Sequence, residues 1–151
     1  MIVLDASALL AYLFAEAGHE AVAEVIDASC LSSVNLAEVL SRFARDGHNP
    51  EMVHHQIAGS GIEIVPFLGE DAALAAGLVP LTQQFGLSLG DRACLALALR
   101  RDAPAFTVAT GNVWSISSRS PTIHSCPMPS HSFVPTGTLA LPRCSRRTTA
   151  E

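Results

Sequence analysis

Three acidic residues stand where a short apolar segment of the chain meets a helix-like segment. Asp5 follows the apolar run IVL, Glu38 comes shortly after the run LSSV, and Asp91 precedes the apolar run ACLALAL. Ligands of an open parallel sheet bind outside the carboxyl ends of its strands. If these runs belong to such a sheet, we expect the three carboxylates to lie near one another at that edge.

A divalent cation would make this arrangement of charges favourable. Three carboxylates in one crevice repel each other and raise one another's pKa unless a cation neutralises them. Mg²⁺ prefers oxygen ligands, uses one or two carboxylates plus waters, and leaves positions for phosphate oxygens. Such a site can activate a water molecule for phosphodiester cleavage. The pattern therefore predicts a magnesium site that uses Asp5, Glu38 and Asp91.

Each acid also has a purely structural interpretation. The spacings Asn35-Leu-Ala-Glu38 and Ser88-Leu-Gly-Asp91 both match a capping box, in which the acid at the third helical position hydrogen-bonds back to the N-cap residue. Asp5 could cap the helix that follows it. The metal site thus depends on the three acids lying together.

The elements that must position these acids alternate along the chain. We expect strands at 2–4, 30–34, 62–67 and 105–110, and helices at 8–14, 19–28, 35–45, 50–58, 70–85 (broken at Pro80) and 91–101. Short apolar strands that alternate with helices imply a parallel sheet covered on both faces. The predicted fold class is therefore α/β, with three layers.

Composition limits the classes of partner and location. The chain has 151 residues, a net charge of −5 and no lysine, and residues 1–110 alone carry a net charge near −8. This field does not attract nucleic acid at long range, so contacts with phosphate require individual arginines or a bound cation. No apolar stretch reaches membrane-spanning length, and the four cysteines show no CxxC spacing. We expect a cytoplasmic protein with reduced cysteines and no membrane contact.

The character of the sequence changes near residue 110. Residues 111–151 contain five of the nine prolines, eight serines and a single acid, Glu151. Such a composition is typical of irregular or disordered segments. The predicted organisation is one domain over 1–110 and an irregular tail over 111–151.

Three segments resemble the acidic motifs of a known family. MIVLDASALLAYLF, SSVNLAEVLSRF and GLSLGDRACLALALR are similar, in order and spacing, to those of the PIN-domain family, in particular the VapC-type toxins of bacterial toxin–antitoxin pairs. The resemblance covers about residues 1–110. It implies a small fold with a central parallel sheet flanked by helices and an endoribonuclease activity that depends on Mg²⁺ or Mn²⁺. It also implies an RNA substrate, a cognate antitoxin and a homodimer.

The same resemblance assigns roles to particular residues. Asp5, Glu38 and Asp91 occupy the acidic positions that hold the metal and act in catalysis. Ser7 matches a small hydroxyl residue that orients a ligand or a water. Independently of the resemblance, Arg92 is the best candidate for a contact with phosphate because it adjoins Asp91; an ordinary solvated helix charge is the alternative.

One expected motif is missing. The family continues after its next strand with a sequence like TADRxW, whose aspartate is a fourth acid near the metal, whereas this chain reads TVATGNVW over 107–114. A change of reading frame near residue 109 would explain both the missing acid and the altered tail, and translation of the other frames tests it; a divergent tail is the alternative. The loss leaves a second function open, a catalytically impaired remnant that still binds an antitoxin. A hydrolase that uses Asp5 as nucleophile is disfavoured, because Asp5-Ala6-Ser7 has no second aspartate and the chain has no lysine.

Overall fold

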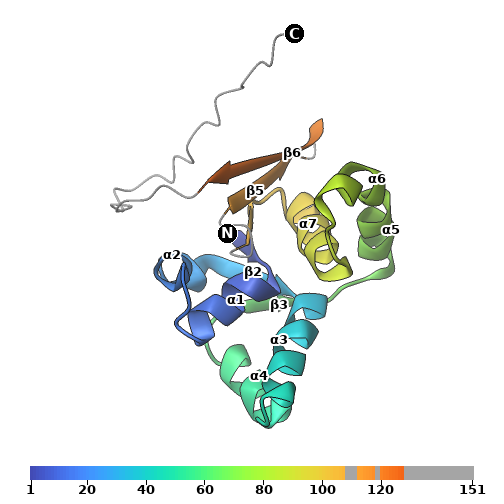
Figure 1. The fold of residues 1–151 in the computed structure, drawn as a ribbon. Helices are drawn as coiled ribbons and strands as arrows, with labels where there is room; N and C mark the ends of the chain where they lie inside the picture. The colour runs from blue at the N-terminus through green and yellow to red at the C-terminus, as the bar shows by residue number, and fades with distance from the viewer. Residues whose placement is uncertain (108–111, 118–119, 128–151) are drawn as a thin grey trace.

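The computed structural model describes residues 1–107, 112–117 and 120–127, which form a three-layer α/β fold around one sheet (Figure 1). The six strands lie in the order β3-β2-β1-β4-β5-β6; the first four are parallel, and β5 and β6 are antiparallel to their neighbours. Their bounds are β1 (Ile2–Leu4), β2 (Ser29–Ser32), β3 (Glu63–Val65), β4 (Ala105–Phe106), β5 (Asn112–Ser117) and β6 (Ser120–Pro127). The predicted α/β class with a parallel sheet is confirmed.

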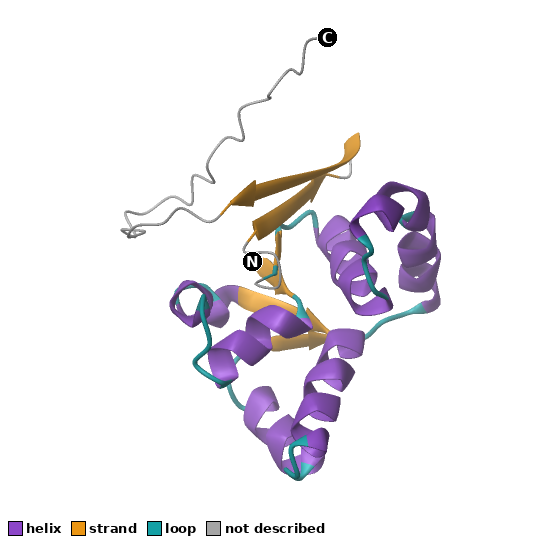
Figure 2. Ribbon diagram, viewed as in Figure 1, coloured by secondary structure: helices purple, strands orange, loops and turns teal. Residues whose placement is uncertain are grey.

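Helices cover both faces of the sheet, as Figure 2 shows. Figure 1 separates α5, α6 and α7, at the right of the view, from the group formed by α1 to α4. The helices are α1 (Ala6–Leu13), α2 (His19–Ala23), α3 (Ser33–Arg45), α4 (Pro50–Ala58), α5 (Gly69–Gly77), α6 (Val79–Thr82) and α7 (Leu89–Arg101), with single 3₁₀ turns η1 (Ile26–Ala28) and η2 (Gln83–Phe85). No helix in these described ranges is long and apolar enough to cross a membrane.

Alternate residues of the parallel strands enter two separate cores. Ile2 and Leu4 pack with the buried side chains of α1, α3 and α4, whereas Val3 packs with those of α7. Both faces of β1 are therefore buried, which explains why this strand is a continuous apolar run without polar alternation. Asp5 is the first residue after that run, so the charge lies at the strand's carboxyl end.

Helix α7 is buried on most of its surface because it packs on β1 and β2 and also against α5 and α3. Its residues 93–98 are all buried. The buried apolar helix predicted over 91–101 is thus confirmed, with a start two residues earlier. Cys94 belongs to this core: its side chain is buried and its Sγ lies 3.9 Å from the Val3 carbonyl oxygen.

One predicted helix is shorter than expected, and another is broken near Pro80 as predicted. The segment 19–28 forms α2 and then η1, which are separate elements. The segment 70–85 is divided into α5, α6 and η2, with Pro80 in the first turn of α6. Proline fits that position because its missing N–H would have no intrahelical partner there, whereas it would break a continuous helix.

The segment after residue 111 differs from the expected irregular tail in the part that the structure describes. Strand β5 pairs antiparallel with β4, in the register Ala105↔Trp114, and β6 pairs antiparallel with β5. Pairing satisfies the backbone groups that β4 would otherwise expose at the sheet edge, which favours strands even without a strong apolar alternation. The expectation for residues 128–151 lies outside the described residues.

Candidate metal centre

Asp5 is held at the junction between β1 and α1. Its backbone N–H continues the sheet by donating to the Phe106 carbonyl oxygen at 3.1 Å, and its extended backbone allows it to be the N-cap of α1. The carboxylate accepts a hydrogen bond from the Ala8 N–H at 2.7 Å. The capping interpretation of Asp5 is confirmed. The residue is only 4% exposed, so the cap lies in a low-dielectric environment.

Two hydroxyl groups surround this carboxylate. Ser7 Oγ donates to both carboxylate oxygens of Asp5, at 2.9 and 3.1 Å, and lies 3.2 Å from Thr107 Oγ1. Burial raises the pKa of the Asp5 carboxyl, while hydrogen bonds from Thr107, Ala8 and Ser7 act in the opposite direction. The negative charge of Asp91 raises the same pKa further. Asp5 and Asp91 are therefore close enough to interact electrostatically.

Asp91 lies in the first turn of α7 and forms the predicted capping box. Its carboxylate accepts from the Ser88 N–H at 2.7 Å, and its own N–H donates to Ser88 Oγ at 3.2 Å. This reciprocal pair fixes the start of α7 and satisfies two N–H groups that the helix leaves unpaired. One oxygen of Asp91 is thus committed to the backbone.

The second predicted capping box is wrong. The N-cap of α3 is Ser32, whose Oγ accepts from the Val34 N–H at 3.3 Å, and Asn35 lies inside the helix with 1% exposure. The reason is the length of β2, which ends at Ser32 because that residue still pairs with Val65. The spacing of Asn35 and Glu38 therefore reflects one turn of a helix face.

Glu38 lies against the start of α7. A Cβ built on Gly90 would be only 2.5 Å from Glu38 Oε2, so the carboxylate occupies space that exists because residue 90 is glycine. The Asn35 Nδ2 donates to the Gly90 carbonyl oxygen at 3.1 Å. The partial positive charge at a helix N-terminus favours a carboxylate in this position.

The structure relates the three acids only in pairs: the charge of Asp91 acts on the pKa of Asp5, and Glu38 lies beside Gly90, the residue that precedes Asp91. Within residues 1–107, however, no group of three or more His, Cys, Asp or Glu side chains is arranged closely enough to hold a metal ion. The donor set around Asp5 consists of carboxylate and hydroxyl oxygens, which are the ligands that a hard divalent cation prefers.

Thr107 is a site residue that the motif comparison did not single out. It follows β4 directly, as Asp5 follows β1, and its hydroxyl reaches Ser7. The rule that ligands bind at strand ends would have found it. The next residues of TVATGNVW, 108–111, lie outside the described residues. The structure therefore does not test the effect of the missing fourth acid, which stays a prediction from the sequence.

Arg92 is partly engaged by the protein itself. Its Nη1 donates to the Leu87 carbonyl oxygen at 2.6 Å, while its Nε is buried and has no hydrogen-bond partner among the described residues. A contact between this side chain and phosphate stays a prediction.

Comparisons with known proteins agree with this architecture. A family model described as "PIN domain" matches residues 2–110. No curated protein sequence matches the chain significantly. Three similar solved structures are VapC20 of Mycobacterium tuberculosis, a sarcin-ricin loop cleaving toxin, at 16% identity and a TM-score of 0.59; FitAcB of Neisseria gonorrhoeae at 22% and 0.57; and a toxin–antitoxin complex of Klebsiella pneumoniae at 21% and 0.54. The match with VapC20 covers 71% of this chain and 88% of that protein. The match with FitAcB covers 74% and 89%, and the match with the Klebsiella pneumoniae complex covers 73% and 88%. At these identities the likeness establishes the fold.

Proposed function

The chain belongs to the PIN domain family, and from this we propose that it is a metal-dependent endoribonuclease, the toxin of a type II toxin–antitoxin pair. The observation that carries the proposal is the buried carboxylate of Asp5, placed at a strand end within electrostatic range of Asp91. Burying a charge beside a like charge is unfavourable without a cation. A structural role alone would be served as well by an uncharged cap such as asparagine.

Asp5 and Asp91 are the proposed metal ligands, with Glu38, whose carboxylate lies beside Gly90, as a further proposed ligand. Mg²⁺, or Mn²⁺ in its place, would supply a Lewis acid that polarises a phosphate and lowers the pKa of the attacking water. The hydroxyls of Ser7 and Thr107 hold the Asp5 carboxylate in one orientation, since Ser7 already donates to both of its oxygens. The three acids would position the metal and the water, and none of them would act as a covalent nucleophile.

The proposed partners follow from the same family. Two of the similar structures are a toxin–antitoxin complex from Klebsiella pneumoniae and FitAB bound to a DNA fragment. We propose a cognate antitoxin, an RNA substrate and a homodimer for this protein, acting in the cytoplasm. With a net charge of −5 and no lysine, the protein offers little general attraction to RNA, which gives the cation a second role as the local positive charge.

Three observations favour a second candidate function, a PIN domain that binds an antitoxin without cleaving RNA. One Asp91 oxygen is committed to the capping box, and residues 107–114 contain no acid in the sequence. In addition, residues 1–107 contain no group of three His, Cys, Asp or Glu side chains close enough to hold a metal ion. Asp5 and Asp91 would then have to provide most of the metal binding.

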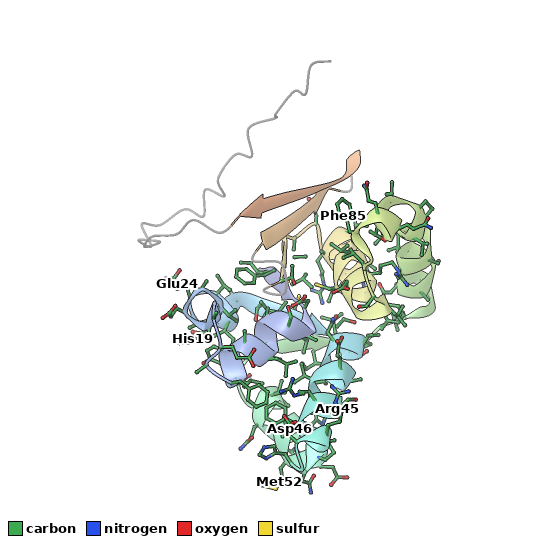
Figure 3. All side chains as sticks on the ribbon, viewed as in Figure 1. His19, Glu24, Arg45, Asp46, Met52 and Phe85 are labelled. Carbon is green, nitrogen blue, oxygen red and sulfur yellow. The ribbon has the colours of Figure 1, made fainter. Side chains whose placement is uncertain are left out.

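An RNA cleavage assay separates the two functions. The wild type, Asp5→Asn, Asp91→Asn and Glu38→Gln are incubated with RNA in Mg²⁺, in Mn²⁺ and in EDTA. Asparagine keeps an oxygen that can cap α1, so Asp5→Asn removes the charge and little else. Glu24→Gln is the matched control, because Glu24 is exposed at the end of α2, on the outside of the molecule (Figure 3).

The nuclease proposal expects metal-dependent cleavage in the wild type and in Glu24→Gln, and only the EDTA level in Asp5→Asn and Asp91→Asn. The second function expects no cleavage by any variant, together with copurification of the wild type with the product of an adjacent antitoxin reading frame. Cleavage that persists in EDTA would falsify the metal site.

A further inference from the structure

Asn35 is a buried polar residue that the proposed chemistry does not use. Its side chain is 1% exposed, and its Nδ2 donates to the Gly90 carbonyl oxygen at 3.1 Å, which joins α3 to the first turn of α7 across 55 residues of sequence. The carbonyl is only an acceptor, so the amide nitrogen must face it. The Asn35 Oδ1 is consequently directed elsewhere, and it has no hydrogen-bond partner among the described residues.

This amide is a poor choice for stability alone. A buried acceptor without a donor loses its hydration and gains nothing in return, which largely offsets the benefit of the one bond that Nδ2 makes. An apolar side chain of similar volume would fill the same space without that loss. The benefit of Asn35 therefore lies in the position that its one hydrogen bond fixes.

That position lies between two of the proposed acids. Glu38 is one turn after Asn35 on the same face of α3, and Asp91 is the residue after Gly90. Gly90 contributes the other half of the arrangement, because its missing Cβ leaves the space in which Glu38 Oε2 lies. Any sliding of the first turn of α7 along α3 would change the separation of Glu38 from Asp91.

We propose that Asn35 and Gly90 are positioning residues, which lock the first turn of α7 onto α3 so that the carboxylates of Glu38 and Asp91 face the same space. This inference rests on the proposed metal-dependent function, because only acids that act together need a fixed separation. It assigns Asn35 no contact with substrate or with the reacting atoms.

Amide hydrogen exchange tests the lock without reference to activity. In Asn35→Leu, the amides of Asp91 and Arg92, which donate to Ser88, should exchange about five- to tenfold faster, as expected for loss of one buried hydrogen bond. The control is Val39→Ala. Val39 is fully buried on the same helix and lies in the core beside α1 and α4, so its truncation should raise exchange throughout the core by one common factor.

The second readout is the affinity for Mn²⁺, measured by electron paramagnetic resonance. Asn35→Leu and Gly90→Ala should both bind Mn²⁺ several-fold more weakly than the wild type, while Val39→Ala binds as the wild type does. Gly90→Ala reaches this result by a different route, since its Cβ displaces Glu38 and leaves the Asn35 bond in place.

The outcomes are separable. Exchange at Asp91 and Arg92 that is unchanged in Asn35→Leu, or that rises only together with the rest of the core, overturns the positioning role whatever the activity. If the wild type neither binds Mn²⁺ nor cleaves RNA, the proposed function is overturned, and the exchange pattern still decides whether Asn35 holds the turn.

Discussion

Arg100, near the end of α7, contacts two neighbouring acids on α5 that differ sharply in burial. Its Nε lies 3.1 Å from Asp71 Oδ1, and its Nη1 lies 3.6 Å from Glu70 Oε1. The Asp71 side chain is 2% exposed and that of Glu70 is 67% exposed. Asp71 also accepts from the Leu68 N–H at 2.8 Å, which caps α5. Neutralising each acid in turn separates a buried ion pair from a solvated one.

The expected cost of Asp71→Ala follows from these contacts. Removing one partner of a buried pair costs about 3–5 kcal/mol when both partners are buried. Arg100 keeps a quarter of its side chain in solvent, and its Nε–H is not aligned on the Asp71 oxygen well enough for a hydrogen bond. We therefore assign about 1–2 kcal/mol to the lost pair and about 1 kcal/mol to the lost cap.

The sum for Asp71→Ala is about 2–3 kcal/mol, which corresponds to a fall in Tm of roughly 8–12 °C for a domain of this size. Asp71→Asn keeps an oxygen for the Leu68 N–H and should lose only the pair, about 1–2 kcal/mol. Glu70→Gln, the matched control, should change stability by less than about 0.5 kcal/mol because solvent screens the pair.

Urea unfolding followed by circular dichroism measures all three variants against the wild type. The reasoning is refuted if Glu70→Gln costs as much as Asp71→Asn, because burial would then not set the strength of the pair. It is also refuted if Asp71→Ala and Asp71→Asn are equal, because the cap would then contribute nothing.

Three further predictions concern the site and the core. Burial raises the pKa of Asp5 above its ordinary 3.8, so the stability that its protonated form contributes is lost as the pH rises through the raised pKa. Asp5→Asn should therefore become more stable relative to the wild type as the pH rises above the ordinary pKa of 3.8, and urea unfolding at a series of rising pH values checks the sign. Ser88→Ala removes the acceptor of the Asp91 N–H and should cost about 1 kcal/mol in the same assay. Leu9→Ala, at a fully buried position of the core that includes α1, should cost about 2–5 kcal/mol; a smaller loss would show that this core closes around the cavity.

The parallel part of the sheet could be predicted because its strands are buried on both faces. IVL at the start of the chain has no polar alternation, and it is followed at once by a helix pattern. Such a pattern indicates a strand that is buried on both faces inside an α/β fold. The same pattern predicts that Asp5 lies at the end of a strand, where the structure has it.

The local role of Asn35 could not be predicted from spacing. Ser32 and Asn35 are both good N-cap residues, and each begins a pattern compatible with a helix. The choice between them depends on where β2 stops, and that is set by its pairing with Val65 more than 30 residues later. Strands β5 and β6 were missed for a similar reason, since an edge strand is stabilised by its neighbour's unpaired backbone as much as by its own side chains.

The position of β1 in the chain also affects when the candidate metal centre can assemble during synthesis. Strand β1 is synthesised before β4, because β4 and the hydroxyl of Thr107 lie about a hundred residues later in the chain. Contacts so distant in sequence form late, after the intervening segments have emerged and folded. The acids of the candidate metal centre are therefore not yet assembled on a nascent chain that ends before residue 107. The surroundings of Asp5 are complete only after Thr107 has been added.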